Sequence, residues 1–307
     1  MLRRAFKREV LFQVKKLFLV AGLAFLSSIL VAIAAPMENS DMTQTSHQIN
    51  KLYVFGDSLS DAGNVFQATG RAYPPNPPYF QGRYSNGLVW VEYLSSKLAT
   101  SEQNTNLAYG GATTGTNGVN GIPGLLTQVY GFTKTNQQLS PNALYVLWAG
   151  ANDYLYSGAN PTVTVNNISA AIQSLSKAGA KKILVANLPD LGKLPATCNS
   201  GNASALSSLT TAHNLALAKS IEELNQKLGS KTQITILDTY SLYQEAIRKP
   251  EKFGLTNVTS ACSNNYTVCD NPDKFLFWDG IHPTTMAHRI LAEAALRALK
   301  TDIVLQQ

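Results

Sequence analysis

Short apolar runs alternate with stretches of helical periodicity along most of this 307-residue chain. The runs are rich in β-branched and aromatic residues and are bounded by turn residues, as buried strands are. Each is followed by apolar residues spaced three and four positions apart, the pattern of an amphipathic helix. This alternation predicts an α/β fold with one parallel sheet, covered by helices on both faces and joined by right-handed crossovers. The five expected strands lie at 52–55, 106–109, 143–149, 182–188 and 233–238.

The expected helices connect these strands without any internal repeat, linker or second domain. Pro283 favours the start of the closing helix, because proline is preferred in the first turn, and the residues just before it, 275–282, read as irregular. We therefore expect one folded domain over residues 51–300, followed by a tail over 301–307. The expected helices lie at 88–99, 124–133, 163–178, 204–228, 240–248 and 283–299.

The first 35 residues have the pattern of a secretory signal peptide. Six basic residues and one acid form a charged head, residues 17–31 are apolar or small, and Ala32-Ile33-Ala34 provides a small-x-small cleavage site. Because the apolar run approaches the length that crosses a bilayer, an uncleaved membrane anchor is the alternative. Residues 36–50 are polar and aperiodic, so we expect a flexible lead. The pattern predicts a secreted or periplasmic protein.

The charge of the chain argues against a nucleic-acid partner. The formal charge is +6, but residues 1–35 carry +5 of it, which leaves +1 for all the rest. The basic character therefore belongs to the targeting segment and not to a binding surface of the domain.

The three cysteines, Cys198, Cys262 and Cys269, do not have the spacing of a zinc site, and no histidine is near enough to complete one. In an exported protein, Cys262 and Cys269 are expected to form a disulfide because they are close in sequence. Cys198 then remains either as a free thiol or as the true partner of one of the other two. We expect neither a metal nor a cofactor, since the glycine-rich stretch 110–124 also lacks the dinucleotide-binding spacing.

A serine follows the first expected strand directly, in Gly56-Asp57-Ser58-Leu59. Open α/β sheets bind their ligands at the carboxyl ends of the strands, so Ser58 is a candidate nucleophile. The alternative is an ordinary turn in which Ser58 caps a helix. Asp57 and Asp61 are interpreted as structural residues that hold this turn through side-chain hydrogen bonds.

A nucleophilic serine needs a base, and the base needs a group that orients it. Of the four histidines, His282 stands out because Asp279 lies three residues before it, within reach of its Nδ1–H. The alternative is a turn that leads into the last helix, with Asp279 in solvent. His47, His213 and His288 are expected to be surface or packed histidines.

Acyl transfer also needs hydrogen-bond donors for the developing oxyanion. Candidates occur where strands end: the Ser58 N–H, the N–H of Gly110 or of Gly111, and the side-chain amide of Asn152. In a parallel sheet these strand ends meet at one edge, so the donors can converge. The alternative for Asn152 is a helix cap after the third strand.

Taken together, four blocks of this sequence resemble those of the SGNH hydrolases, also called the GDSL lipase/esterase family. They are Gly56-Asp57-Ser58-Leu59, Gly110 in Tyr-Gly-Gly-Ala, Gly150-Ala-Asn152-Asp153 and Asp279-Gly-Ile-His282. The similarity covers about residues 51–300 and is strongest to the subgroup with plant esterases and secreted bacterial phospholipases, lysophospholipases and acyltransferases. One block alone is a weak signal, whereas four in this order and spacing are specific.

The resemblance implies a three-layer α/β/α sandwich with flavodoxin-like strand order. It also implies catalysis by Ser58, His282 and Asp279, with an oxyanion hole of Ser58, Gly110 and Asn152. The expected activity is hydrolysis of carboxylic esters in lipid-like small molecules such as lysophospholipids or phospholipids, with acyl transfer to other acceptors as a further outcome.

The alternatives are a carbohydrate O-acetylesterase and a non-catalytic binding protein on the same scaffold. The loop 71–80 carries prolines and aromatic side chains that suit an acyl chain or a sugar equally well. We expect a monomer that contacts a membrane surface only to reach its substrate.

Overall fold

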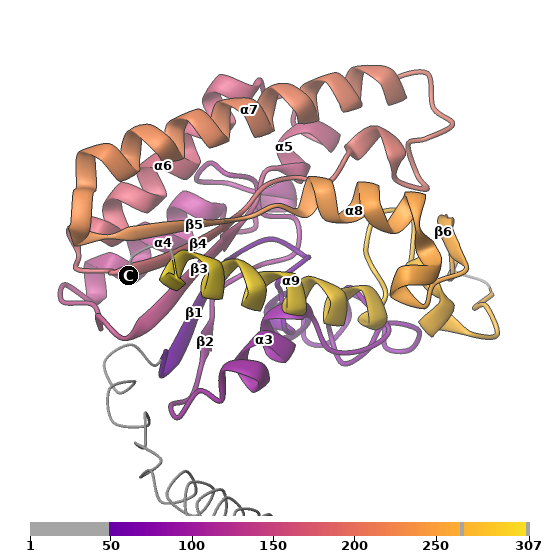
Figure 1. Cartoon of the computed structure of the whole chain (residues 1–307). Helices are drawn as coiled ribbons and strands as arrows, with labels where there is room; N and C mark the ends of the chain where they lie inside the picture. The colour runs from indigo at the N-terminus through magenta and orange to yellow at the C-terminus, as the bar shows by residue number, and fades with distance from the viewer. Residues whose placement is uncertain (1–48, 265–266, 305–307) are drawn as a thin grey trace, which may run out of the picture. The chain divides into compact units, whose positions relative to one another are not determined.

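The computed structural model describes residues 49–264 and 267–304 (Figure 1). The expected signal peptide and all but the end of the expected lead lie outside the described residues, as do the last three residues of the expected tail. Within the described part of the chain, no helix is both long and apolar enough to span a membrane.

A five-stranded parallel sheet forms the centre of the domain, as the sequence predicted, with strand order β2-β1-β3-β4-β5. This is the order of flavodoxin-like folds. Every residue of the central strand β3 is buried, which explains its continuously apolar sequence. The strands are β1 (Lys51–Gly56), β2 (Thr105–Asn106), β3 (Ala143–Trp148), β4 (Lys182–Ala186) and β5 (Gln233–Leu237).

Helices cover both faces of this sheet (Figure 1). Alternate residues of β3 enter two separate cores: Leu144 and Val146 face one core, and Tyr145 and Leu147 face the other. The first core is closed by α3 (Trp90–Leu98), α8 (Thr239–Arg248) and α9 (Thr285–Val304), and the second by α4 (Leu125–Thr135), α6 (Pro161–Lys177) and α7 (Ala203–Leu228).

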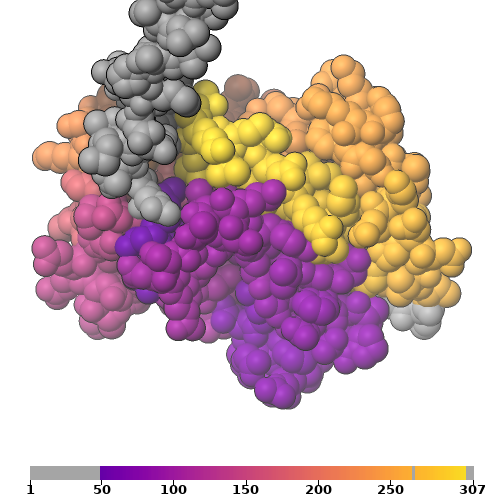
Figure 2. Space-filling view, turned by 60° about the horizontal axis from the view of Figure 1, so that its bottom comes forward, coloured from indigo at the N-terminus to yellow at the C-terminus, as the bar shows by residue number. Residues whose placement is uncertain are grey.

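The helix α9, at the end of the described chain, lies against α3 (Figure 2). The backbone N–H of Trp90 donates to His288 Nδ1 at 3.2 Å across this contact. Because α3 follows β1 and α9 follows the Asp279–His282 turn, their packing brings two sequence-distant parts of the expected site to one end of the sheet.

Several short elements were not expected. Two helices of five residues, α2 (Asn64–Ala68) and α5 (Ala151–Leu155), follow β1 and β3. The residues 275–282, expected to be irregular, begin with the strand β7 (Phe275–Phe277), which pairs in parallel with β6 (Asn257–Ala261). Single 3₁₀ turns lie at Val119–Gly121, Leu191–Lys193, Gly229–Lys231, Pro250–Phe253 and Pro272–Lys274.

The closing helix begins at Thr285 and not at Pro283, and it continues beyond the expected end at residue 299 to Val304. Pro283 is in extended backbone that forms a β-bridge with Phe277. Thr284 caps the helix instead, because its hydroxyl accepts from the Ala287 N–H at 3.2 Å.

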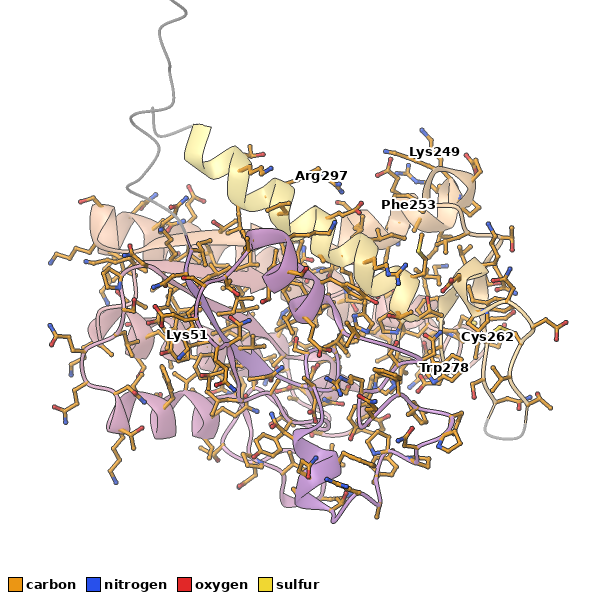
Figure 3. All side chains as sticks on the ribbon, turned by 90° about the horizontal axis from the view of Figure 1, so that it is seen from below. Lys51, Lys249, Phe253, Cys262, Trp278 and Arg297 are labelled. Carbon is orange, nitrogen blue, oxygen red and sulfur yellow. A yellow bond between two sulfur atoms is a disulfide. The ribbon has the colours of Figure 1, made fainter. Side chains whose placement is uncertain are left out.

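The expected disulfide between Cys262 and Cys269 is present, and Cys198 is a free, half-buried thiol. The bridge closes the loop between β6 and β7, close to the strand that leads to Asp279. Backbone N–H groups of Cys262 and Ser263 donate to the carbonyls of Phe277 and Trp278. Figure 3 labels Cys262 and Trp278 in this region.

Candidate active site

The turn that carries Ser58 is held by its neighbours before and after the serine. Gly56 has φ +149°, and a Cβ there would lie 2.1 Å from the Trp148 carbonyl oxygen, so only glycine fits. The next N–H, of Asp57, donates to that same oxygen at 3.2 Å. The buried Gln128 amide then bonds both the N–H and the carbonyl of Gly56. These contacts fix Ser58 at the carboxyl edge of β1.

The structure brings Ser58, His282 and Asp279 into one hydrogen-bonded chain. Ser58 Oγ lies 2.8 Å from His282 Nε2, and His282 Nδ1 lies 2.7 Å from Asp279 Oδ2. The other carboxylate oxygen, Asp279 Oδ1, accepts from the backbone N–H groups of Ile281 and His282 at 2.8 and 2.7 Å. Asp279 is therefore not in solvent, and the tight turn itself orients the carboxylate toward the imidazole.

The charge on Asp279 determines which group donates in each hydrogen bond between Asp279, His282 and Ser58. Burial acts to raise the pKa of Asp279, but the imidazole of His282 and the hydrogen bonds from His282, Tyr79 and Ile281 hold that pKa well below its usual value. An ionised carboxylate accepts only, so the Nδ1–H of His282 is the donor to Asp279. The lone pair of Nε2 then faces Ser58 Oγ and can take the serine proton.

One further contact to Asp279 was not expected from the sequence. The hydroxyl of Tyr79 donates to Asp279 Oδ2 at 2.7 Å from the proline-containing loop 71–80. The two residues are 200 positions apart, and no local pattern connects them. This loop, whose aromatic side chains were expected to suit an acyl chain or a sugar, thus contacts the acid of the candidate triad directly.

The expected donor of Gly110 is already occupied. Its N–H donates to Asp61 Oδ2 at 2.9 Å. The alternative donor, Gly111, remains available, because its N–H has no hydrogen-bond partner among the described residues. Glycine is needed at position 110 for a different reason, since a Cβ there would lie 2.3 Å from the ring of Tyr84.

Two more unpaired donors lie at the same strand ends. The Ser58 N–H has no partner within the described part of the chain. Asn152 Nδ2 gives one hydrogen to the Ala112 carbonyl at 2.9 Å and keeps the second without a partner among the residues that are described. The alternative of a helix cap is wrong for Asn152, because Gly150 stands at the N-cap of α5 and no side chain caps it.

The neighbouring acidic side chains accept hydrogen bonds from backbone N–H groups, as expected for Asp57 and Asp61. The Asp61 carboxylate accepts from the N–H groups of Gly63, Asn64 and Val65 in addition to Gly110, and Asp57 Oδ1 accepts from Leu59. Burial raises the pKa of Asp57 to about 7 and also raises the pKa of Asp61. Asp153 accepts from the N–H and the hydroxyl of Thr114 and so ties the glycine-rich loop to α5.

His213 and His288 are packed and not assembled into a site. His213 Nδ1 lies 2.9 Å from the Tyr154 hydroxyl, and burial lowers the pKa of His213 to about 4. Burial likewise lowers the pKa of His288 to about 3. His47 lies outside the described residues. Among the residues that the structure describes, no cluster of His, Cys, Asp or Glu could hold a metal ion.

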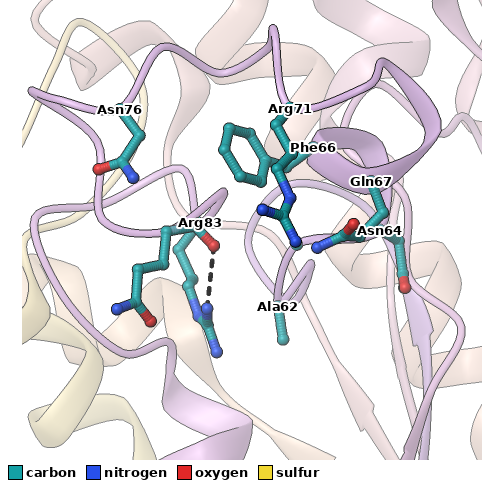
Figure 4. Close-up of a pocket in the computed structure, with 9 residues that line it drawn as sticks. Ala62, Asn64, Phe66, Gln67, Arg71, Asn76 and Arg83 are labelled. Carbon is teal, nitrogen blue, oxygen red and sulfur yellow. Dashed lines mark hydrogen bonds between the residues drawn. The ribbon is translucent and has the colours of Figure 1, made fainter.

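A polar pocket of about 480 Å³ lies between α2 and the loop that follows it (Figure 4). Arg71 and Arg83 both reach into it. Arg83 is paired with Glu92 at 2.6 Å and donates to the Gln81 carbonyl, whereas Arg71 has no ion-pair partner among the described residues. The lining contains no carboxylate: Ala62, Gly63, Asn64, Phe66, Gln67, Arg71, Asn76, Gln81 and Arg83.

Comparison with known proteins identifies the family. Residues 52–295 match the family model of the GDSL-like lipase/acylhydrolases. The chain belongs to this family. With its esterase and lipase relatives, this makes the chain an ester-hydrolysing enzyme.

Two bacterial relatives illustrate the range of this GDSL hydrolase family. The thermolabile hemolysin of Vibrio parahaemolyticus is 31% identical over 85% of this chain and 66% of its own length. The phosphatidylcholine-sterol acyltransferase of Aeromonas hydrophila is 28% identical over 82% of this chain and 91% of its own length.

Solved structures match the fold. The inhibitor-bound aryl esterase of M. smegmatis aligns with a TM-score of 0.52 at 15% identity, over 82% of this chain and 99% of its own. A lipolytic G-D-S-L protein of Veillonella parvula aligns with a TM-score of 0.51 at 17% identity, over 81% and 98% of the two chains.

Proposed function

We propose that this GDSL hydrolase is an exported enzyme that cleaves lipid-like carboxylic esters through an acyl-enzyme on Ser58. The observation that carries the proposal is the hydrogen-bonded chain from Ser58 Oγ through His282 to Asp279. A serine, a neutral imidazole and an ionised carboxylate in this order are the groups needed for nucleophilic acyl transfer.

Acylation begins when Ser58 Oγ attacks the ester carbonyl carbon while its proton passes to His282 Nε2. The carbonyl oxygen becomes an oxyanion next to the unpaired donors: the Ser58 N–H, the Gly111 N–H and the free hydrogen of the Asn152 amide. The C–O bond to the alcohol then breaks, and Nε2 returns the proton to the leaving alcohol. Hydrogen-bond donors held in place around a developing charge are usually the largest single contribution to catalysis of such reactions.

Deacylation repeats these steps with water. The water gives a proton to His282 Nε2 and its oxygen attacks the acyl-enzyme, after which the acid leaves and Ser58 recovers its proton. An alcohol in place of water would give acyl transfer. The acyltransferase named among the relatives supports this second outcome, and the balance between water and alcohol acceptors is part of the proposal.

The polar pocket supports a substrate with an acidic head group. Its one charge without an ion-pair partner among the described residues is that of Arg71. Two of its lining residues, Ala62 and Gly63, follow the Ser58 turn closely in sequence. A guanidinium without a competing carboxylate suits a phosphate. Together with the lipid ester named for the acyltransferase relative, this favours phospholipids or lysophospholipids over acetylated sugars.

The test of substrate class is to profile purified protein against lysophospholipid, diacyl phospholipid, a neutral short-chain ester and an acetylated sugar, with the released acid quantified. We expect the phospholipids to be hydrolysed with the highest kcat/KM. Arg71→Gln should lower kcat/KM for the phospholipids and leave the neutral ester unaffected. Preference for the acetylated sugar would replace the lipid proposal with the carbohydrate O-acetylesterase.

The test of the chemistry is a set of single and double variants. Ser58→Ala and His282→Ala should each remove nearly all hydrolysis, and the double variant should lose little more, because residues that act as one unit are strongly non-additive. Independent, additive losses would contradict a shared mechanism.

A further inference from the structure

The Tyr79 hydroxyl is the fourth hydrogen-bond donor to Asp279. Asp279 Oδ1 accepts from two backbone N–H groups, and Asp279 Oδ2 accepts from His282 Nδ1 and from Tyr79, each at 2.7 Å. Asp279 Oδ2, the oxygen that faces His282, therefore accepts hydrogen bonds from both the imidazole and a phenol. Donation to an ionised acceptor is stronger than between neutral groups.

The proton of Tyr79 stays on its hydroxyl at any working pH. Burial and the adjacent Asp279 raise the pKa of Tyr79 well above its ordinary value. The phenol is thus a permanent donor, while its ring is held edge-on by Trp278 at 6.3 Å and by Tyr84 at 6.4 Å between centroids. Tyr84 in turn lies 5.1 Å from the imidazole of His282.

The same residue anchors the loop 71–80. The Tyr79 N–H donates to the Pro75 carbonyl at 3.1 Å, and the next N–H, of Phe80, donates to the Ser85 carbonyl at 2.8 Å. Only the hydroxyl of Tyr79 joins this loop to Asp279 by a hydrogen bond among the described residues. The position of the loop and the electrostatics of the acid are therefore linked through one contact.

We propose that Tyr79 is a positioning residue of the acyl-transfer reaction, which holds Asp279 Oδ2 in place and moderates the basicity of His282 while it docks the loop 71–80 over the site. The inference rests on the proposed function. Without the phenol, the full carboxylate charge acts on the imidazolium and holds its proton more firmly. The base then becomes available only at higher pH.

The experiment compares the pH dependence of kcat/KM for the parent, Tyr79→Phe and Tyr73→Phe on a neutral short-chain ester. Tyr79→Phe keeps the ring contacts, so we expect an unchanged thermal midpoint and KM. The acid limb of its profile should move upward by roughly 0.5–1 pH unit, and kcat should fall by roughly 3–10-fold. Tyr73→Phe removes a hydroxyl from the same loop that does not contact Asp279, so its acid limb should match the parent.

A purely structural role predicts a different pattern. If Tyr79→Phe changes only KM or the thermal midpoint and leaves the acid limb in place, Tyr79 anchors the loop alone and the inference is wrong. Incorporation of 3,5-difluorotyrosine at position 79 gives an independent test that keeps the donor. This stronger donor should move the acid limb to lower pH, and an upward or absent movement would overturn the inference.

Failure of the inference is distinguishable from failure of the proposed function. If activity depends on Ser58 but the pH profile does not change with the substitution at position 79, only the proposed role of Tyr79 is wrong. Loss of the Ser58 dependence itself, measured with Ser58→Ala on the same ester, overturns both.

Discussion

At the residue scale, we propose two separable functions for the Asn152 amide. One hydrogen supports the Ala112 carbonyl, and the other is unpaired and available for an oxyanion. Asn152→Ala should therefore lower kcat by about 10²–10³. It should also lower the free energy of unfolding by about 1–3 kcal/mol, because a buried carbonyl loses its donor. Steady-state kinetics and denaturant unfolding measure the two effects.

Asn167→Ala is the matched control, because Asn167 Nδ2 bonds Thr114 Oγ1 at 3.1 Å in the same glycine-rich loop. This control should lose stability and keep its turnover. If Asn152→Ala also keeps near-normal turnover, the amide is structural and the oxyanion hole is misassigned.

Asp57 should make stability depend on pH. Burial raises the pKa of Asp57 to about 7 in the folded protein, from an ordinary 3.8. The folded state thus favours the protonated acid, and this contribution is complete below about pH 4 and is lost as the pH rises through 7. Asp57→Asn keeps an acceptor for the Leu59 N–H and removes the titration. The variant should be more stable than the parent at pH 8, by about 4 kcal/mol at most.

The control for Asp57 is Asp238→Asn, which should act with the opposite sign. Burial acts to raise the pKa of Asp238, but hydrogen bonds from Ser241, Asn187 and the backbone lower it overall. Its charged form therefore stabilises the folded state above pH 4, and the variant should lose stability there. The free energy of unfolding is measured for Asp57→Asn and the parent from pH 4 to 8. If the difference between the two is the same at every pH, a buried, titrating Asp57 is ruled out.

Residues of the candidate site differ in how far sequence alone locates them. Ser58, Asp279 and His282 stand in short local patterns, so their positions are predictable. Gly110 and Gly111 are adjacent and identical, and the choice between them depends on Asp61, 49 residues before Gly110. Tyr79 has no signal at all, because its partner is brought close only by the packing of the whole domain.

At the element scale, the disulfide should stabilise the β6–β7 region without taking part in the chemistry. Replacing Cys262 and Cys269 together by Ser should lower the free energy of unfolding by about 2–3 kcal/mol, since the cross-link restricts the unfolded chain. Turnover should be nearly unchanged, because the Asp279 carboxylate is held by the N–H groups of Ile281 and His282. A large loss of kcat with the fold intact would mean that the bridge positions the acid.

Long helices were predictable, whereas the short elements α2, α5 and β7 were not, for one physical reason. Helices such as α6 and α7 bury a repeating apolar stripe that reveals the 3.6-residue period. The five residues of α2 and of α5 span little more than one turn, and β7 has three residues, so none of the three shows a period. The end of β7 at Phe277 still decides where Asp279 lies, which is why the turn before α9 needed the structure.

At the scale of the whole molecule, the sequence pattern of residues 1–35 predicts export with cleavage after Ala34 or nearby. Intact-mass measurement on protein recovered from outside the cytoplasm tests this directly. The expected mass lacks the first 34 residues. A mass that retains them would replace cleavage with the membrane anchor.

The central claim is that Ser58 is a nucleophile activated by His282, and covalent labelling tests it most directly. A fluorophosphonate reacts with an activated serine, and peptide mapping of the labelled parent identifies the residue. We predict one modified position, Ser58, with labelling absent in Ser58→Ala and far slower in His282→Ala. A label on Ser60 or Ser85, or an unchanged labelling rate in His282→Ala, would contradict the account.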